Sequence, residues 1–265
     1  MKKITVTAPA KINLCIDVLK KDASGYHQIQ TVLCVCENYQ DEITIFETKE
    51  SDKVSIVNAD KNQPIKMEEN LVFKALKLLK STYKIEKNAY IKITKNIPIS
   101  SGLGGGSSDA AATLKALNKL WELNLNDEQL IAMAEQLGMD VPFFILGGTA
   151  IGTNYGEKVT PLPHITDLKF KIEFQPQRGK ITPQDHNKAD ATLQQPTNKT
   201  ANMYAALDSK KCGKTTAKTG ELITAIKKNN KENILKNLHN DFETISTVKE
   251  GWHLSGSGHA IFTIL

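Results

Sequence analysis

Along the first part of the chain, apolar and polar residues alternate, which is the pattern of strands with one buried face. Residues 3–19 and 29–36 follow this pattern with many β-branched side chains, and residues 42–46, 54–57 and 89–94 continue it. Together these segments predict a mixed sheet that dominates the opening of the protein.

Helical periodicity interrupts the strands. Apolar residues recur at helical spacing over residues 71–83, and further helices are predicted over about 108–120 and 128–137. Asp127 stands where an N-cap is expected for the last of these helices, and Gly138 stands where that helix would end. These strands and helices predict one α+β unit.

The pattern changes in the second half of the chain. Residues 175–195 are polar and contain prolines, which is typical of a loop or linker. Helical patterns resume over residues 201–207, 221–227 and 231–238. A Gly/Ser turn and an apolar strand, HLSGSGHAIFTIL, follow them. We therefore expect a second, smaller α+β lobe.

The predicted fold is α+β with two lobes, residues 1–164 and residues 165–265. Of the 265 residues, 40% are apolar and 24% are charged, as in an ordinary globular protein with an ample core. No stretch approaches the length of a membrane span, and the N-terminus lacks the apolar core of a signal peptide. We expect a cytoplasmic protein, either a monomer or a weak homodimer, without a membrane partner.

The distribution of charge and the spacing of the cysteines exclude further classes of protein. The chain has 34 Lys and Arg against 29 Asp and Glu, a net charge of +5, and its lysines are spread out. Nucleic acid is therefore not the expected partner. The cysteine spacing fits neither a CxxC redox motif nor a zinc site. We expect reduced thiols at Cys15, Cys34, Cys36 and Cys212.

The most informative segment is NIPISSGLGGGSSDAAATLKALNKL, residues 96–120, in which glycines lead directly into a predicted helix. Backbone without Cβ atoms can approach a polyphosphate closely, and its N–H groups and those of the first helical turn can bind the anion. Ser107 and Ser108 can add hydroxyl donors or hold a magnesium ion. A flexible loop or a helix-packing turn is the simpler alternative, but four glycines before SSDAA favour phosphate. The glycines are Gly102, Gly104, Gly105 and Gly106.

Two common phosphate-binding loops do not fit this segment. A P-loop needs a lysine after its last glycine, where this chain has Ser107. A dinucleotide-binding fingerprint needs spaced glycines directly after the first strand, with an acidic residue about twenty positions later. Neither pattern matches, so a different kind of phosphate site is expected.

Lys11 in TAPAKINL and Asp140 in LGMDVPFF carry the second candidate chemistry. An aspartate in so apolar a context needs a hydrogen bond or an opposite charge, and Lys11 is a candidate partner that would keep it ionised. Taken alone, Lys11 could be a solvated strand-end lysine and Asp140 an N-cap before Pro142. SGSGHAIF, residues 255–262, is either a tight hairpin turn or a second small-residue loop that passes close to the first.

Taken together, PAKINL, PISSGLGGGSSDAA and SGSGHAIF resemble the three motifs of the GHMP kinase superfamily, small-molecule kinases that share one ATP-binding loop. SGYHQIQT and GMDVPFF, with GGTAIGTNYGEKVTPLP downstream, resemble the branch of that superfamily that phosphorylates a diphosphocytidyl methylerythritol. The resemblance covers most of the chain and is strongest over residues 5–163.

This resemblance implies a ribosomal-protein-S5-like N-terminal half and a ferredoxin-like C-terminal half, which we expect to be shortened, with the active site between them. It implies ATP and Mg²⁺ as cofactors. The implied reaction transfers the γ-phosphate to the 2-hydroxyl of the diphosphocytidyl substrate, a step of the non-mevalonate route to isoprenoid and terpenoid precursors.

Residue roles follow from the same resemblance. Asp140 matches the catalytic base, and Lys11 the residue that orients it and stabilises developing charge. The positions that match nucleotide and phosphate contacts are Asn70, Lys95, Gly102, Gly104, Gly105, Gly106, Ser107 and Ser108, the last also a magnesium ligand. The positions that match substrate contacts are Asn13, Tyr26 and His27, where an aromatic ring can stack on cytosine and a histidine can bind its edge. Tyr26 and His27 could instead be a strand-end pair that only packs.

The second lobe departs from the family pattern, in which a threonine is followed four residues later by an aromatic residue that covers the cytosine. Thr200 with Tyr204 is the better match, and Thr182 with His186 is the alternative. Two other functions remain open. Another GHMP small-molecule kinase would have no cytosine to stack on Tyr26, and a catalytically silent nucleotide-binding relative would need neither a catalytic lysine nor a base.

Overall fold

The computed structural model of the chain describes residues 2–58, 66–165, 168–175, 199–207, 212 and 215–265. Two sheets organise this part of the chain, one of seven strands and one of three. The larger sheet contains β1 (Lys3–Lys21), β2 (His27–Thr48), β3 (Lys53–Val57), β4 (Asn88–Thr94), β5 (Thr149–Thr153), β6 (Lys158–Leu162) and β8 (His239–Asn240). The strands that the alternating pattern predicts are thus all present.

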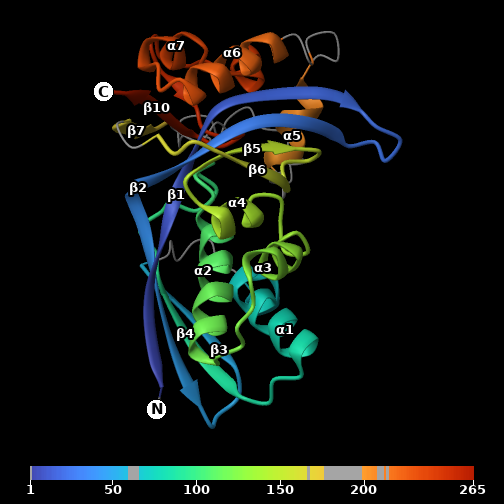
Figure 1. Cartoon of the computed structure of the whole chain (residues 1–265), viewed down its shortest axis with the longest axis vertical. Coiled ribbons are helices and arrows are strands. Elements are labelled where there is room, and N and C mark those ends of the chain that lie inside the picture. Colours follow the sequence, from blue (N-terminus) through green and yellow to red (C-terminus); the bar gives the residue numbers. More distant parts are fainter. Residues whose placement is uncertain (1, 59–65, 166–167, 176–198, 208–211, 213–214) are drawn as a thin grey trace, which may run out of the picture.

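Strands β1 and β2 form one long antiparallel hairpin that serves two parts of the sheet. The second half of β2 pairs with β4, whereas its first half pairs with β5. Register shifts between Pro9 and Ala10 and between Asn13 and Cys15 mark the change, since β-bulges bend the strands that carry them. In Figure 1 the hairpin turns here, from the long axis of the molecule to a course across its top.

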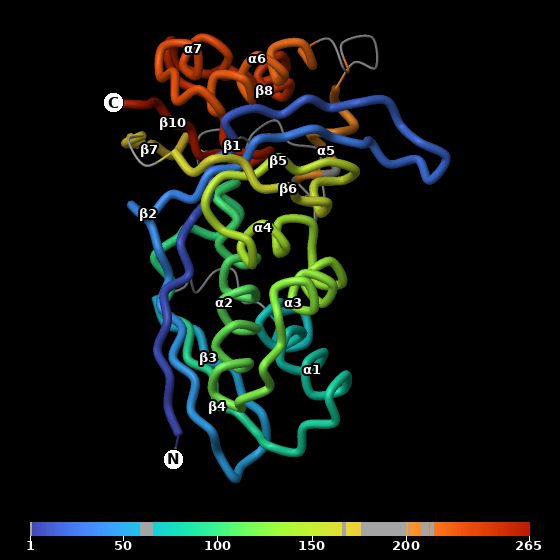
Figure 2. Tube along the Cα trace, in the orientation of Figure 1, coloured from blue at the N-terminus to red at the C-terminus, as the bar shows by residue number. Residues whose placement is uncertain are grey.

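Helices cover one face of the lower part of the sheet (Figure 2). They are α1 (Leu71–Tyr83), α2 (Gly105–Leu120), α3 (Asp127–Ala134) and α4 (Val141–Leu146), with a short 3₁₀ turn, Met67–Glu69, before α1. The apolar faces of sheet and helices meet in a core that includes Ile43, Ile91, Leu76, Leu117 and Phe143, all fully buried. Burial of these faces is the main force that stabilises this layer.

Three predicted helix boundaries in this layer are wrong. Helix α2 begins at Gly105 rather than near Ser108, because Gly104 precedes it in a left-handed conformation with φ of 73°. The N-cap of α3 is Asn126 rather than Asp127: the Asn126 side chain accepts from the backbone of Gln129, whose side chain accepts from the N-cap in return. That helix ends at Ala134, before Gly138.

The C-terminal part of the chain adds a second layer above the hairpin (Figure 1). Its elements are β7 (Phe170–Phe174), α5 (Lys199–Ala206), α6 (Thr216–Lys227), α7 (Lys231–Lys236), a 3₁₀ turn (Asp241–Ile245), β9 (His253–Leu254) and β10 (Ala260–Ile264). The smaller sheet has the order β7-β10-β9. Most of the predicted linker, together with Thr182 and His186, lies outside the described residues.

The two parts share strands and core. Strand β8 pairs in parallel with β1, and one apolar cluster joins Ile12 and Val32 to Leu222 and Phe262. A boundary between residues 164 and 165 therefore stays a prediction. Cys15, Cys34 and Cys36 are buried and free, as expected. None of the helices in the described ranges has the length and apolar character needed to cross a bilayer.

Buried polar groups also tie β1 to the second part. The Asp17 carboxylate lies 2.9 Å from His239 Nε2 and accepts from the hydroxyls of Thr215 and Thr219. Nδ1 of His239 lies 2.8 Å from the Asn237 carbonyl oxygen, which can only accept. Burial alone would lower the pKa of His239, but the hydrogen bonds to Asp17 and Asn237 raise it. Both ring nitrogens of His239 thus face hydrogen-bond acceptors, an arrangement that favours the charged imidazolium.

Candidate active site

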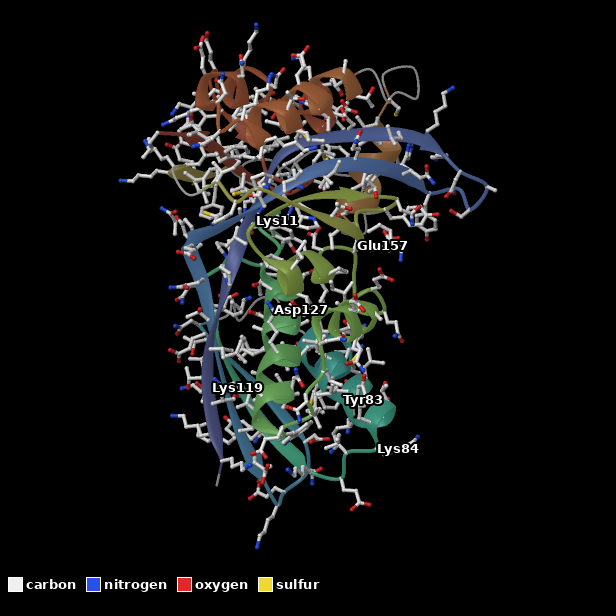
Figure 3. The ribbon with its side chains drawn as sticks, viewed as in Figure 1. Lys11, Tyr83, Lys84, Lys119, Asp127 and Glu157 are labelled. Atoms are coloured by element: carbon white, nitrogen blue, oxygen red, sulfur yellow. The ribbon has the colours of Figure 1, made fainter. Side chains whose placement is uncertain are left out.

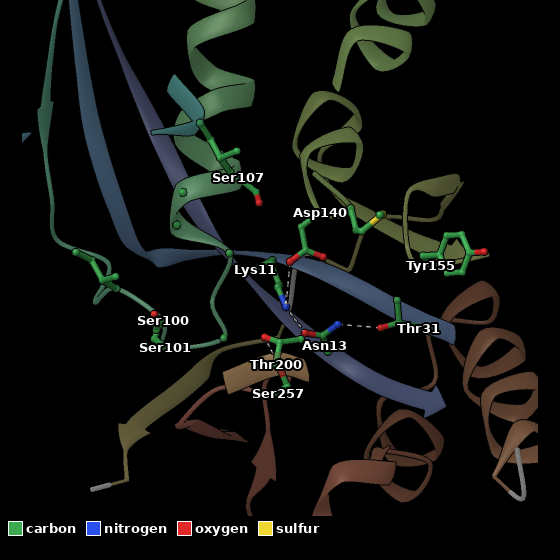
Figure 4. A pocket seen from close by; sticks show the side chains of 18 of the residues that line it. Lys11, Asn13, Thr31, Ser100, Ser101, Ser107, Asp140, Tyr155, Thr200 and Ser257 are labelled. Carbon is green, nitrogen blue, oxygen red and sulfur yellow. Dashed lines mark hydrogen bonds and ion pairs between the residues drawn. The ribbon is translucent and has the colours of Figure 1, made fainter. Parts of the chain in front are cut away.

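A cavity of about 1070 Å³ lies between the helical layer and the C-terminal elements (Figure 4). Its volume is enough for more than one small ligand, since typical ligand pockets measure about 300–1,000 Å³. The residues predicted for the site that line it are Lys11, Asn13, Tyr26, His27, Asn70, Lys95, Gly102, Gly104, Gly105, Gly106, Ser107, Asp140, Thr200 and Tyr204. Ser108 does not line it; this residue is buried, and its hydroxyl has no hydrogen-bond partner among the described residues.

The glycine loop is clasped by the C-terminal turn. A Cβ on Gly102 would lie 2.1 Å from the Ser255 carbonyl oxygen, and one on Gly258 would lie 2.0 Å from the Ser101 carbonyl oxygen. That same Ser101 oxygen accepts hydrogen bonds from the N–H groups of His259 and Ala260, at 3.1 and 2.9 Å. Only glycine permits so close a crossing. The expectation that SGSGHAIF passes close to the first loop is confirmed.

The start of α2 leaves bare backbone at the cavity. The first N–H groups of a helix have no acceptor within it and attract anions. A Cβ on Gly106 would meet only Leu71, at 3.9 Å, so packing does not require glycine there. Its missing side chain instead leaves room for a ligand. The Lys11 N–H donates to the Leu103 carbonyl oxygen at 2.9 Å, which attaches β1 to the loop.

Lys11 and Asp140 meet at the centre of the cavity, with Lys11 Nζ 3.7 Å from Asp140 Oδ2 (Figure 4). The Lys11 side chain is only 4% exposed, whereas that of Asp140 is 36% exposed. Burial lowers the pKa of Lys11, and the charge of Asp140 opposes that shift. The predicted pair is confirmed. Asp140 occupies the N-cap position of α4, yet its side chain makes no capping bond and lines the cavity instead.

A buried chain of side chains fixes the Lys11 ammonium. Lys11 donates to Asn13 Oδ1, and Asn13 Nδ2 donates to the Thr31 hydroxyl at 2.9 Å. Thr31 in turn donates to the Cys15 carbonyl oxygen at 2.7 Å. Thr31 was not predicted as a site residue, although it is the last residue of SGYHQIQT. Figure 3 shows Lys11 at the junction with the upper layer, far from Tyr83 and Lys84.

Lys95 has a different environment. Its ammonium pairs with Asp41 and, at 2.7 Å, with Asp109, and all three side chains are buried. Burial would lower the pKa of Lys95, but the two carboxylates raise it. Burial also raises the pKa of Asp109 to about 7. Neither carboxylate was predicted from the sequence; only the position of Asp109 inside GGGSSDAA pointed toward the site.

Asn70 has a structural task of its own. Its side chain accepts from the Val72 N–H at 2.8 Å and caps α1, and it lines the cavity, as Lys95 does. Ile56, Leu71 and Ile93 line the cavity too, and a Cβ on Gly105 or Gly106 would come within 4 Å of Lys95 or Leu71. This end of the cavity, which we call the aliphatic arm, is therefore a largely apolar slot next to the glycine loop.

The opposite end, the aromatic arm, is lined by Tyr26, His27, Tyr155 and Tyr204. His27 Nδ1 donates to the Leu19 carbonyl oxygen at 2.6 Å, which leaves Nε2 available to a ligand. Tyr204 stacks on His27 with ring centroids 5.8 Å apart, and burial raises its pKa to about 12. In Figure 4, Tyr155 lies at one side and Ser100 and Ser101 at the other, with Lys11 and Asp140 between them.

Thr200 lies near the centre of the site rather than in either arm. Its hydroxyl accepts from Ser257 at 3.1 Å, so α5 is linked to the turn that clasps the glycine loop. The sequence pointed to Thr200 and Tyr204 but not to Ser257 or Tyr155, which both line the cavity. The whole arrangement offers two arms with a carboxylate and a lysine at their junction.

Comparison with known proteins assigns the chain to a family. Residues 70–148 match the GHMP kinases N terminal domain. A "4-diphosphocytidyl-2-C-methyl-D-erythritol kinase" of Clostridium botulinum (strain Eklund 17B / Type B) is 36% identical over 278 aligned residues, which cover 98% of this chain and 90% of the relative. The chain belongs to the GHMP kinase family. This confirms the predicted membership and the two-lobed α+β fold.

Other relatives of this GHMP kinase agree. A kinase of the same name from Geobacillus sp. (strain WCH70) is 45% identical, but the match spans 61% of this chain and 55% of the relative. A solved "4-(cytidine 5'-diphospho)-2C-methyl-D-erythritol kinase" superimposes with a TM-score of 0.71 at 26% identity, covering 98% of this chain and 90% of that one. A homoserine kinase from Cytophaga hutchinsonii, at 19% identity and a TM-score of 0.69, shares the fold.

Proposed function

We propose that this GHMP kinase transfers the γ-phosphate of ATP to the 2-hydroxyl of 4-diphosphocytidyl-2-C-methyl-D-erythritol, in the non-mevalonate route to isoprenoid precursors. The observation that carries the proposal is the Lys11–Asp140 pair at the junction of two ligand-sized arms. The names of the full-length relatives support the choice of substrate.

The aliphatic arm suits the nucleotide. Its glycine loop and the first turn of α2 present bare backbone for phosphates, with the Ser107 hydroxyl beside them. Ile56, Leu71 and Ile93 offer apolar surface for a purine, with Asn70 and Lys95 at its edge. The γ-phosphate would then point toward the junction, where Lys11 and Asp140 lie.

The aromatic arm suits the diphosphocytidyl end of the acceptor. Tyr26 presents a ring on which cytosine can stack, and Nε2 of His27 can accept a hydrogen bond from the exocyclic amine of the base. Tyr204 approaches the same space from α5, and Thr200 on the same helix lies near the centre of the site. With the cytosine held there, the methylerythritol hydroxyls extend toward Asn13 and Asp140.

The chemical step needs a group that accepts the hydroxyl proton. Asp140 can take this proton because its carboxylate lines the cavity, 3.7 Å from the Lys11 ammonium. The oxygen of the acceptor then attacks the γ-phosphorus while the bond from that phosphorus to the oxygen bridging the β- and γ-phosphates breaks, and ADP leaves. Lys11, held by Asn13 and Thr31, stays in place to stabilise the negative charge that builds up on the transferred group.

A magnesium ion would be held mainly by phosphate oxygens. No group of three or more acidic, histidine or cysteine side chains suited to a metal lies within the described ranges, but sites of this kind need only one or two protein ligands. Ser107 lines the cavity, and the buried Ser108 hydroxyl lacks a partner in the same ranges, so both fit a hydroxyl ligand. When bound, magnesium neutralises charge on the phosphates.

The test is a coupled assay of ADP release with ATP and the diphosphocytidyl substrate. We expect turnover with this acceptor and none of comparable size with mevalonate, homoserine or galactose. Equal turnover with one of those alcohols would reject the assignment in favour of another GHMP kinase. Calorimetric binding of the substrate without turnover would favour a catalytically silent relative.

We also propose that the enzyme acts in the cytoplasm, as a monomer or a weak homodimer. Three free, buried cysteines, Cys15, Cys34 and Cys36, support a reducing compartment. Sedimentation at micromolar concentration tests the oligomeric state, and a stable higher oligomer would contradict it.

A further inference from the structure

The turn at residues 154–157, which belongs to GGTAIGTNYGEKVTPLP but has received no role so far, lies against the residues proposed to bind cytosine. Tyr26 and His27 end the tip of the β1–β2 hairpin, and the turn between β5 and β6 packs beside that tip. This second turn carries Tyr155, which lines the aromatic arm (Figure 4). The contacts between the two turns indicate what Tyr155 does.

Asp22 joins the two turns because each of its two carboxylate oxygens accepts from a different turn. Oδ1 accepts from the Ser24 N–H at 2.8 Å and from the Ser24 hydroxyl, so it shapes the hairpin tip. Oδ2 accepts from the Tyr155 hydroxyl. The bonds from Ser24 and then from Tyr155 lower the pKa of Asp22. Its carboxylate is therefore charged at neutral pH and keeps both partners.

Backbone contacts strengthen this connection. The Ile29 N–H donates to the Asn154 carbonyl oxygen at 2.6 Å, and Gln28 Nε2 donates to the side chain of Asn154 at 3.4 Å. Two turns that are far apart in the sequence are thus held together on both sides of the hairpin. A change in the β5–β6 turn is transmitted directly to the tip.

The Tyr26 ring depends on this neighbour for its orientation. Its side chain is 72% exposed, and no hydrogen bond to its hydroxyl is formed within the described ranges. The turn holds its backbone, since the Asp22 N–H donates to the Tyr26 carbonyl oxygen at 3.0 Å. Its ring meets Tyr155 edge to face, with centroids 6.3 Å apart and an angle of 72°. Such a contact occupies at most one face of Tyr26 and leaves another for a planar ligand.

We propose that Tyr155 is a positioning residue for the nucleobase end of the acceptor: it holds the Tyr26 ring ready to stack on cytosine, and Asp22 anchors Tyr155 in turn. This inference rests on the proposed function and adds a residue to its binding site. Because an exposed aromatic ring otherwise samples several rotamers, fixing it beforehand reduces the entropy lost when the base binds.

The test measures binding of cytidine diphosphate by calorimetry, which does not require turnover. Tyr155→Leu removes the ring and should weaken binding about tenfold, and Tyr155→Phe, which keeps the ring but loses the hydroxyl bonds to Asp22 and Ser24, about two- to threefold. The matched control is Tyr90→Phe on β4. It removes a tyrosine hydroxyl that is hydrogen bonded, at 2.8 Å, to the hydroxyl of Ser55 on β3. Its affinity for cytidine diphosphate should not change.

Steady-state kinetics separate positioning from a general loss of structure. KM for the diphosphocytidyl acceptor should rise in step with the dissociation constant, whereas KM for ATP and kcat should stay the same. Equal affinities in all variants, a parallel rise in KM for ATP, or no binding of cytidine diphosphate by the unaltered chain would each overturn the inference. Binding that responds to Tyr155 without any turnover of the acceptor would instead overturn the proposed function alone.

Discussion

Two lysines, Lys11 and Lys95, line the same cavity. Their surroundings differ, and the difference indicates a chemical role for Lys11 and a structural role for Lys95. Lys11 faces one carboxylate, Asp140, across 3.7 Å, and that carboxylate is more than a third exposed. Lys95 is enclosed by two buried carboxylates, Asp41 and Asp109. Burial dominates at Lys11 and lowers its pKa, whereas the two carboxylates outweigh burial at Lys95 and raise it.

The difference shows which charges a ligand can still use. The Lys95 ammonium is satisfied by the protein itself and ties β2 to α2 beneath the glycine loop. The Lys11 ammonium and the Asp140 carboxylate are joined more loosely, and Asp140 is open to the cavity. A reacting hydroxyl can therefore enter beside Asp140, but nothing comparable can enter between Lys95 and its partners.

The largest expected effect concerns the open pair. Asp140→Ala should lower kcat by about a thousandfold, because loss of a general base typically removes a factor of 10²–10⁴. ATP affinity should stay nearly unchanged, as measured by calorimetry. Asp127→Ala, which removes an exposed carboxylate from the first turn of α3, is the matched control and should leave kcat within about twofold. An unchanged kcat in Asp140→Ala would exclude this residue from the mechanism.

The enclosed lysine should matter more for stability. Lys95→Met leaves two buried carboxylates without their cation and should reduce the free energy of unfolding by about 3 kcal/mol. Lys11→Met leaves Asp140, which water can solvate, and the Asn13 side-chain oxygen without its donor, so the loss should be smaller, about 1–2 kcal/mol. Urea denaturation followed by circular dichroism compares the two variants. Equal losses would show that the two lysines are not distinguished by their surroundings.

The pH dependence of stability gives a finer comparison. The pKa of Asp109 is raised to about 7 from an ordinary value near 4, so between these pH values the folded state binds more protons than the unfolded state. This group therefore makes stability fall as pH rises toward 7. In Asp109→Asn that fall should be absent, so the variant should lose less stability than the unaltered chain between pH 5 and 8. Parallel curves would contradict the assigned pKa.

The smallest expected effect tests the support of Lys11. Thr31→Val keeps the shape of the side chain but removes the hydroxyl that orients Asn13. The Lys11 ammonium should then be held less firmly, and kcat should fall about two- to fivefold, in line with the loss of one orienting hydrogen bond. KM for ATP should not move. A loss as large as that of Asp140→Ala would mean that Thr31 acts on the substrate directly.

The sequence predicted those parts of the site whose residues lie together in one continuous segment of the chain. The glycine loop, Lys11 and Asp140 are set by local residue types. Their placement was only partly right, since Gly105 and Gly106 lie inside α2 and Lys11 lies in the middle of β1 rather than near its end. Asp41 and Asp109 were missed because their significance comes from a shared lysine, which only the pairing of β2 with β4 and the packing of α2 bring near. Tyr155 was missed for the same reason, since nothing in its own turn indicates that a hairpin tip lies beside it.

The sequence pointed correctly to Asp140 as a cavity residue but predicted its degree of burial less well. Apolar neighbours suggested a buried carboxylate, but α4 directs Val141 and Phe143 into the core while Asp140 lines the cavity. One-dimensional hydrophobicity cannot distinguish the two faces of so short a helix. The assignment of Thr200 and Tyr204 over Thr182 and His186 likewise depended on where α5 packs, and the second pair lies outside the described residues.

The crossing of Gly102 and Gly258 has a consequence for the order in which the protein is made. Translation delivers the glycine loop, Lys11 and Asp140 long before the residues whose amides grip the Ser101 carbonyl. A nascent chain therefore exposes Lys11 and Asp140 before the segment that packs against the glycine loop has been synthesised. Catalytic activity should therefore appear only after the turn at residues 255–258 has packed against the glycine loop. A fragment that ends before this turn should contain Lys11 and Asp140 but remain inactive.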